Sequence, residues 1–118
     1  MTVAVDMCTI VDNWTAFLDT VPMVEIVRSQ TFARWLKRLK DRRAIAKIVQ
    51  RIDRLSLGNF GDVKSVGGGV SELRIDYGPG YRLYFVQRGN GEIVILLCGG
   101  TKKQQNADIA RAQAMAKK

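Results

Sequence analysis

The chain has 118 residues, a formal net charge of +8 and 47% hydrophobic residues, which suits one folded domain with a modest core and argues against overall disorder. It has no histidine and only two cysteines, which excludes a disulfide framework and a zinc site of the usual Cys/His kind. The longest apolar run, residues 93–98, is too short to cross a bilayer, and the N-terminus is acidic where a signal peptide is basic. We therefore expect a cytoplasmic protein with no membrane partner, whose basic charge attracts polyanions such as nucleic acid.

Residues 1–22 differ from the rest of the chain in charge. They contain three aspartates and neither lysine nor arginine, so residues 23–118 carry +11 against −3 for this extension. Two interpretations of the extension stay open. It is a misassigned start that precedes a true initiator at Met23, or it is a short amphipathic helix that docks on the domain through Trp14 and Phe17. In either case the folded domain is expected to span residues 23–118.

A strand and two helices are predicted next. The apolar residues of the segment VEIVRS suit a first strand. The following residues place apolar side chains at the i, i+3, i+4 and i+7 spacing of one helix face and, with Ser29 as N-cap, predict a helix over residues 30–40. A second amphipathic helix is expected to follow Asp41 and to end before Gly58. Both helices carry Lys and Arg on their outer faces, which either keep the domain soluble or take part in RNA binding.

Three strands and a final helix are predicted in the second half. Residues 59–69 form a polar, glycine-rich connection, and residues 70–76, 81–87 and 92–98 follow as strands of an antiparallel meander with glycine turns between them. Residues 102–118 favour a helix but offer few large apolar side chains, which predicts a loosely held one. The fold class expected is α+β: an N-terminal strand and a helical hairpin packed on a small antiparallel β-sheet, then a C-terminal helix.

Basic residues gather on one face of the expected sheet. Strand alternation puts Glu72 and Arg74 on the same face, and Arg82 lies at the start of the next strand. If the apolar face packs on the helical hairpin, these three side chains look outward from the concave side of the sheet. Lys102 and Lys103 follow the last strand, and together the cations suggest a surface that binds a polyanion. Cysteine 98, at the end of that strand, is expected to be a buried small hydrophobe.

Three motifs in this region resemble those of a known family. They are a Glu-Leu-Arg strand that begins at Glu72, a Gly-Pro-Gly-Tyr-Arg turn that ends at Arg82, and a Gly-Gly-Thr-Lys-Lys-Gln segment that begins at Gly99. With the order of the elements, residues 23–118 resemble the RelE/ParE superfamily of bacterial toxins. The closest resemblance is to its HigB-like branch of phage-type addiction module killer proteins. The resemblance implies a RelE-like fold.

The resemblance also implies a function and partners. The chain would be the toxin of a bacterial type II toxin-antitoxin system, neutralised by a co-transcribed antitoxin that in this branch often carries a helix-turn-helix domain. Toxins of the RelE type cut mRNA at the ribosomal A site without a metal or another cofactor and so arrest translation. ParE-like members share the fold and instead poison DNA gyrase, and a degenerate toxin that only binds its antitoxin is a third interpretation. The clustered cations favour the endoribonuclease.

Three catalytic residues follow from the resemblance. Arg82 matches the arginine that stabilises the pentavalent phosphate, and its planar fork suits two phosphate oxygens. Arg74 and Glu72 fall where relatives place basic strand residues that assist proton transfer, and here a glutamate replaces a lysine. Glu72 is either the general base for the ribose 2′-hydroxyl or a structural partner that orients the arginines. Both roles stay open.

Four further residues are candidate contacts to RNA. Lys102 and Lys103 occupy the place of a phosphate-contacting basic residue of the relatives, and one of the two is expected to point inward. Lys64 in the glycine-rich connection is a candidate phosphate contact. Tyr81 could stack on a base, although tyrosines in strands are more often packed into the sheet. Because the chain has no histidine for acid–base chemistry, the ribosome is expected to supply part of the site.

Overall fold

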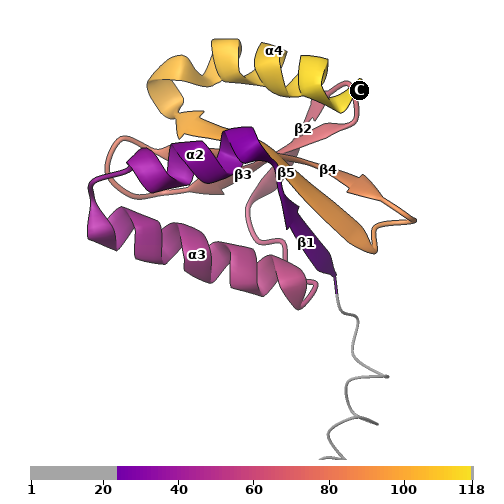
Figure 1. The fold of residues 1–118 in the computed structure, drawn as a ribbon, viewed down its shortest axis with the longest axis horizontal. Helices are drawn as coiled ribbons and strands as arrows, with labels where there is room; N and C mark the ends of the chain where they lie inside the picture. The colour runs from indigo at the N-terminus through magenta and orange to yellow at the C-terminus, as the bar shows by residue number, and fades with distance from the viewer. Residues whose placement is uncertain (1–23, 118) are drawn as a thin grey trace, which may run out of the picture.

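A computed structural model describes residues 24–117 of the chain. The helix proposed around Trp14 and the proposed initiator Met23 lie outside the described residues. The described elements follow one another in the order β1 (Glu25–Arg28), α2 (Gln30–Arg38), α3 (Arg42–Ser56), β2 (Val63–Gly67), β3 (Val70–Ile75), β4 (Tyr81–Arg88), β5 (Ile93–Thr101), the 3₁₀ turn η1 (Lys102–Gln104) and α4 (Gln105–Ala116) (Figure 1).

The strands form one mixed sheet in the order β1-β5-β4-β3-β2. Strands β2 to β5 pair antiparallel with their neighbours, and β1 runs parallel to β5. The predicted α+β class and the meander of β3, β4 and β5 are confirmed. The prediction that residues 59–69 form only a connection is wrong, because β2 lies within them. Val63 and Val66 pack on opposite faces of the sheet, so β2 lacks the repeated apolar residue on one face by which an alternating strand is predicted.

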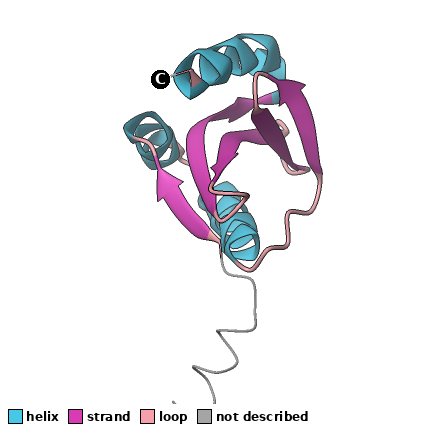
Figure 2. Cartoon of the chain, turned by 90° about the vertical axis from the view of Figure 1, so that its right-hand side faces the viewer, coloured by secondary structure: helices cyan, strands magenta, loops and turns pink. Residues whose placement is uncertain are grey.

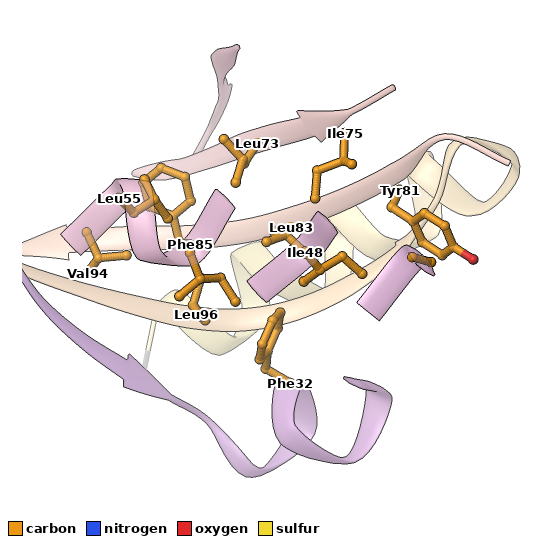
Figure 3. Close-up of a cluster of buried hydrophobic side chains, with 12 residues drawn as sticks. Phe32, Ile48, Leu55, Leu73, Ile75, Tyr81, Leu83, Phe85, Val94 and Leu96 are labelled. Carbon is orange, nitrogen blue, oxygen red and sulfur yellow. The ribbon is translucent and has the colours of Figure 1, made fainter. Parts of the chain in front are cut away.

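The helical hairpin covers one face of the sheet. Helices α2 and α3 bury their apolar sides against the sheet residues that Figure 3 shows, among them Leu83, Phe85 and Leu96. Asp41 caps α3: its Oδ1 accepts hydrogen bonds from the backbone N–H groups of Arg43 (3.0 Å) and Ala44 (3.3 Å). The predicted amphipathic pattern of both helices is confirmed by this packing.

A bulge in β5 fixes the start of α2. The register skips Leu97, since Leu96 pairs with Phe85 and Cys98 with Tyr84. The hydroxyl of Ser29 donates a hydrogen bond to the Leu97 carbonyl (2.6 Å) and accepts one from the N–H of Phe32 (3.0 Å). The predicted N-cap of the first helix is therefore confirmed, and it also ties the helix to the sheet.

Helix α4 covers the opposite face of the sheet (Figures 1 and 2). Ala112 is fully buried there, beside the buried residues Tyr84 and Cys98, and Ile109 and Met115 pack around them. Cys98 is buried, as predicted, and burial is the largest cause that raises the pKa of its thiol, to about 11. The expectation that this helix is loosely held is wrong, because α4 packs on a second core. Small residues such as Ala112 let the helix approach the sheet closely.

Two glycines at the end of β5 let α2 and α4 approach the same strand from opposite sides. A Cβ at Gly99 would collide with the indole of Trp35, and a Cβ at Gly100 would collide with the carboxylate of Asp108. A side chain at either position would therefore push a helix away from the sheet.

Candidate functional site

The cations of β3 and β4 meet at one hollow. Arg74 and Arg82 are direct cross-strand partners, and both line an open hollow of about 400 Å³ together with Lys102 and Asp62. The turn between the strands, residues 78–80, forms its rim. Like charges that face each other across two strands destabilise a sheet, so this pairing favours the binding of a negative group.

The turn and the end of β5 bring the lysine to the arginines. The N–H of Lys102 donates to the carbonyl of Gly80 (2.8 Å), and Gly80 has a φ of +80° that favours glycine. A Cβ on Gly80 would lie 3.3 Å from the Cβ of Lys102. The sequence Gly-Pro-Gly therefore provides both the turn and the space in which Lys102 joins the hollow.

Glu72 lies beneath the hollow and not on its surface. Its side chain is fully buried, so the expectation that it looks outward is wrong, because α4 covers this end of the sheet face. Its Oε1 accepts a hydrogen bond from the Nε of Arg74 (3.1 Å). Its Oε2 accepts from the Nε2 of Gln105 (2.7 Å) and from the hydroxyl of Tyr84 (3.2 Å).

These contacts keep the Glu72 carboxylate ionised. Burial is the largest single influence and would raise its pKa, but the hydrogen bonds from Gln105, Arg74 and Tyr84, with the nearby charge of Arg82, together lower it below the usual value. The pKa of Tyr84 is raised by its own burial and by the Glu72 charge. The carboxylate thus offsets part of the positive charge of the two arginines and holds Arg74 by its Nε.

Arg82 has an unused donor. Its Nε is buried and has no hydrogen-bond partner among residues 24–117. Buried donors are nearly always satisfied in native proteins, so a water molecule or a bound acceptor in the adjacent hollow would complete the hydrogen bonding of this one. Arg82 can therefore offer its guanidinium to an anion that enters the hollow.

The remaining predicted site residues lie elsewhere. Lys103 is exposed on η1 and does not line the hollow, so of the two lysines only Lys102 does. Lys64 is exposed on β2, where it pairs in register with Glu72, and it also lies outside the hollow. Tyr81 is buried in the core under the helical hairpin (Figure 3). Its ring lies 6.2 Å from that of Trp35, so it packs into the sheet.

Gln105 and Asp62 belong to the site but were not anticipated. Gln105 reaches Glu72 from the start of α4, and no local pattern signals a contact over that separation. Asp62 lines the hollow, and its carbonyl accepts a hydrogen bond from the N–H of Arg74 (3.0 Å). Within residues 24–117, acidic, cysteine and histidine side chains form no cluster of three or more that could hold a metal ion. In the same range no helix has the length and apolar character needed to cross a membrane.

Comparisons with known proteins match most of the chain. Residues 34–117 match the model of the family described as "Phage derived protein Gp49-like (DUF891)". A protein of Haemophilus influenzae described as an "Uncharacterized protein" is 54% identical over 93 residues, which cover 79% of this chain and 93% of that protein.

Two solved structures are similar to this one. A mutant of the Escherichia coli toxin RelE in the free state has a TM-score of 0.62 at 10% identity, with 79% of this chain and 96% of that chain covered. The toxin-antitoxin complex RelBE2 from Mycobacterium tuberculosis contains a chain with a TM-score of 0.55 at 21% identity, with 68% of this chain and 99% of that chain covered. At these identities the likeness establishes the fold.

Proposed function

The chain belongs to the phage-derived Gp49-like family and has the fold of the RelE toxins, and from this premise we propose that it is the toxin of a type II toxin-antitoxin pair. We propose further that it is a metal-independent endoribonuclease that cuts ribosome-bound mRNA in the cytoplasm. The observation that carries this proposal is the hollow in which Arg74, Arg82 and Lys102 converge, with one buried donor of Arg82 left unused.

The hollow suits the cleavage of a phosphodiester. Attack of a ribose 2′-hydroxyl on the adjacent phosphorus gathers negative charge on the phosphate oxygens, which fixed cations stabilise. Arg82 provides a planar fork for two of these oxygens, and Lys102 adds a point charge at the rim. Arg74, held by Glu72, completes the set of cations.

Glu72 is assigned the orienting role and not that of general base. A base must reach the proton that it abstracts, and the Glu72 carboxylate is fully buried with hydrogen bonds to both oxygens. Its lowered pKa also makes it a weak base. The acceptor of the 2′-hydroxyl proton is then provided by the ribosome or by the substrate, as expected for a chain without histidine.

The proposed partner is a neutralising antitoxin. One of the similar structures is that of a toxin-antitoxin complex, and the hollow here provides cations for an acidic or amphipathic segment. A helix-turn-helix domain in the antitoxin is proposed from the HigB-like resemblance alone. Co-expression of the neighbouring gene product is expected to restore growth and to yield a complex in a pull-down.

Substitution of Arg82 tests the assignment. Arg82→Ala should lower the cleavage of ribosome-bound mRNA by roughly 10² to 10³, the usual effect of losing one charge-stabilising contact. Arg82→Lys should rescue poorly, because an ammonium keeps the charge but loses the fork. Lys37→Ala, an exposed substitution on α2, serves as the matched control. An Arg82→Ala protein that is folded by circular dichroism and still cuts at the wild-type rate would place the active site elsewhere.

Pulse labelling separates this function from gyrase poisoning. On induction, methionine incorporation is expected to fall before thymidine incorporation, because translation is the direct target. The reverse order would indicate a ParE-like poison. No arrest at all, with retained antitoxin binding, would indicate a degenerate toxin.

A further inference from the structure

A second hollow adjoins the proposed active site at the end of β3. It has a volume of about 300 Å³, and its wall on α3 consists of Lys47, Gln50, Arg51 and Arg54. Ile75 and Asp76 complete its lining, and these two residues also line the first hollow. The two openings are therefore neighbours with a shared border, and together they form a path from Lys102 to α3.

The three cations of the second hollow form one stripe of α3. Lys47, Arg51 and Arg54 follow the i, i+4, i+7 spacing that aligns side chains on one helix face. None of them forms an ion pair with a residue between 24 and 117. Their charges are thus available to an external anion. Their position around a hollow beside the proposed active site favours binding over a role in solubility alone.

Arg51 is fixed in place by the backbone of the first site. Its Nη1 donates to the carbonyl of Arg74 (3.0 Å) and its Nη2 to the carbonyl of Phe60 (3.4 Å). Gly61, at a φ of +67°, leaves room for this guanidinium, since a Cβ there would lie 2.5 Å from its Nη2. Lys47 is also held, with its Nζ 5.3 Å from the centre of the Tyr77 ring. The second hollow is therefore pre-organised in part.

We propose that this second hollow binds a further phosphate of the RNA strand whose scissile phosphate occupies the first hollow. The inference rests on the proposed function and extends it to the path of the substrate. Asp76, on the shared border, favours RNA over an acidic peptide. A nucleic acid strand alternates charged phosphates with uncharged nucleosides and can place a nucleoside at Asp76, whereas a continuous run of carboxylates would be repelled there.

Titration with RNA of two lengths tests the path. The probes are a dinucleotide with a single phosphodiester and a hexanucleotide, both 2′-O-methylated so that they bind without being cut. In ¹⁵N NMR spectra of the full chain, the dinucleotide should shift the resonances of Arg74, Arg82 and Lys102 alone. The hexanucleotide should also shift those of Gln50 and Arg54.

The salt dependence of RNA binding measures how many phosphates the protein neutralises. For single strands, each neutralised phosphate adds about 0.7 to the slope of log K against log salt. Lys47→Ala and Arg54→Ala should each reduce the slope for the hexanucleotide by up to about that amount and leave dinucleotide binding unchanged. Lys37→Ala, an exposed change on α2 that lines neither hollow, is the matched control and should alter neither.

Four results would overturn the proposal. The hexanucleotide could shift only the resonances of residues in the first hollow. The α3 variants could also reduce the affinity for both probes equally, which would indicate a general effect of the positive charge of the domain. A hexaglutamate peptide that shifts Gln50 and Arg54 when RNA does not would assign the surface to an acidic protein. If neither RNA shifts the first hollow, the proposed function fails together with this inference, and that outcome is distinct from a first hollow that responds alone.

Discussion

Replacement of Glu72 by glutamine removes one negative charge and exchanges one acceptor oxygen for a donor amino group. Both changes fall in the hydrogen-bond network of Glu72 beneath the first hollow. The three groups that contact the carboxylate, on Arg74, Tyr84 and Gln105, are all donors. Glutamine has one acceptor oxygen and an amino group that is itself a donor. The amino group either faces Arg74, which cannot accept, or requires Tyr84 and Gln105 both to turn an acceptor atom toward it, and in either orientation at least one hydrogen bond to a charged acceptor is lost.

The magnitude follows from that lost bond. A hydrogen bond to a charged group contributes about 1.5–3 kcal/mol, so Glu72→Gln should lower the free energy of unfolding by about 2 kcal/mol or more. For a domain of this size such a loss lowers Tm by roughly 8–16 °C. Thermal unfolding of the full chain, followed by circular dichroism at pH 7, measures it. Glu92→Gln, an exposed substitution just before β5, is the matched control and should stay within about 0.5 kcal/mol of the wild type.

The effect should depend on pH in a stated direction. The pKa of Glu72 in the folded chain lies below its value of about 4.5 when unfolded. Its contribution to stability is therefore fully present above pH 4.5 and is lost as the pH falls through the folded pKa. The difference in Tm between wild type and Glu72→Gln should narrow as the pH falls below 4.5. Equal Tm values at pH 7, or a difference that does not change with pH, would refute the network.

Three further outcomes are expected. Asp108 is buried, and burial raises its pKa more than the charge of Arg111 lowers it. The contribution of Asp108 to stability is therefore fully present below about pH 3.8 and is lost as the pH rises through the raised pKa. Asp108→Asn should raise Tm at pH 7 but not at pH 3, as measured by thermal unfolding. Gly100→Ala should destabilise the chain by about 1–3 kcal/mol in urea unfolding, through its collision with the Asp108 carboxylate, and an additive Gly100→Ala/Asp108→Ala double variant would contradict this cause. Lys102→Ala should weaken mRNA cleavage clearly more than Lys103→Ala, because only Lys102 lines the first hollow; equal effects in the cleavage assay would argue against that geometry.

The sequence predicted those parts of the fold whose pattern is local. The spacing of Phe32 and Trp35, with Ser29 before them, specifies the first helix and its cap. The Gly-Pro-Gly turn sets the register of the two strands that it joins, and this register makes Arg74 and Arg82 cross-strand partners. The two arginines could therefore be placed side by side on the sheet from the sequence, and both line the first hollow.

What the sequence did not predict depends on contacts between distant segments. Glu72 is buried because α4 covers it, yet α4 has a weak apolar stripe and approaches the sheet through small residues such as Ala112 and across Gly100. Gln105 has no local feature that links it to Glu72. Strand β2 was missed because its two valines face opposite sides, which leaves neither face with a repeated apolar residue. Tyr81 precedes Arg82 on the strand and therefore shares the apolar face of Leu83, so strand alternation already argued against its role as a contact to a base.

The bulge at Leu97 restricts which residue can begin the first helix. At an ordinary N-cap, serine, aspartate and asparagine are nearly equivalent because each offers an oxygen to the helix N–H groups. Ser29 must also give a proton to the Leu97 carbonyl, and one atom, the hydroxyl oxygen, does both. An ionised aspartate has no proton to give and would set its charge against the carbonyl oxygen. Helix statistics treat serine and aspartate as nearly equal N-caps, whereas the second hydrogen bond at this position favours the alcohol over the carboxylate.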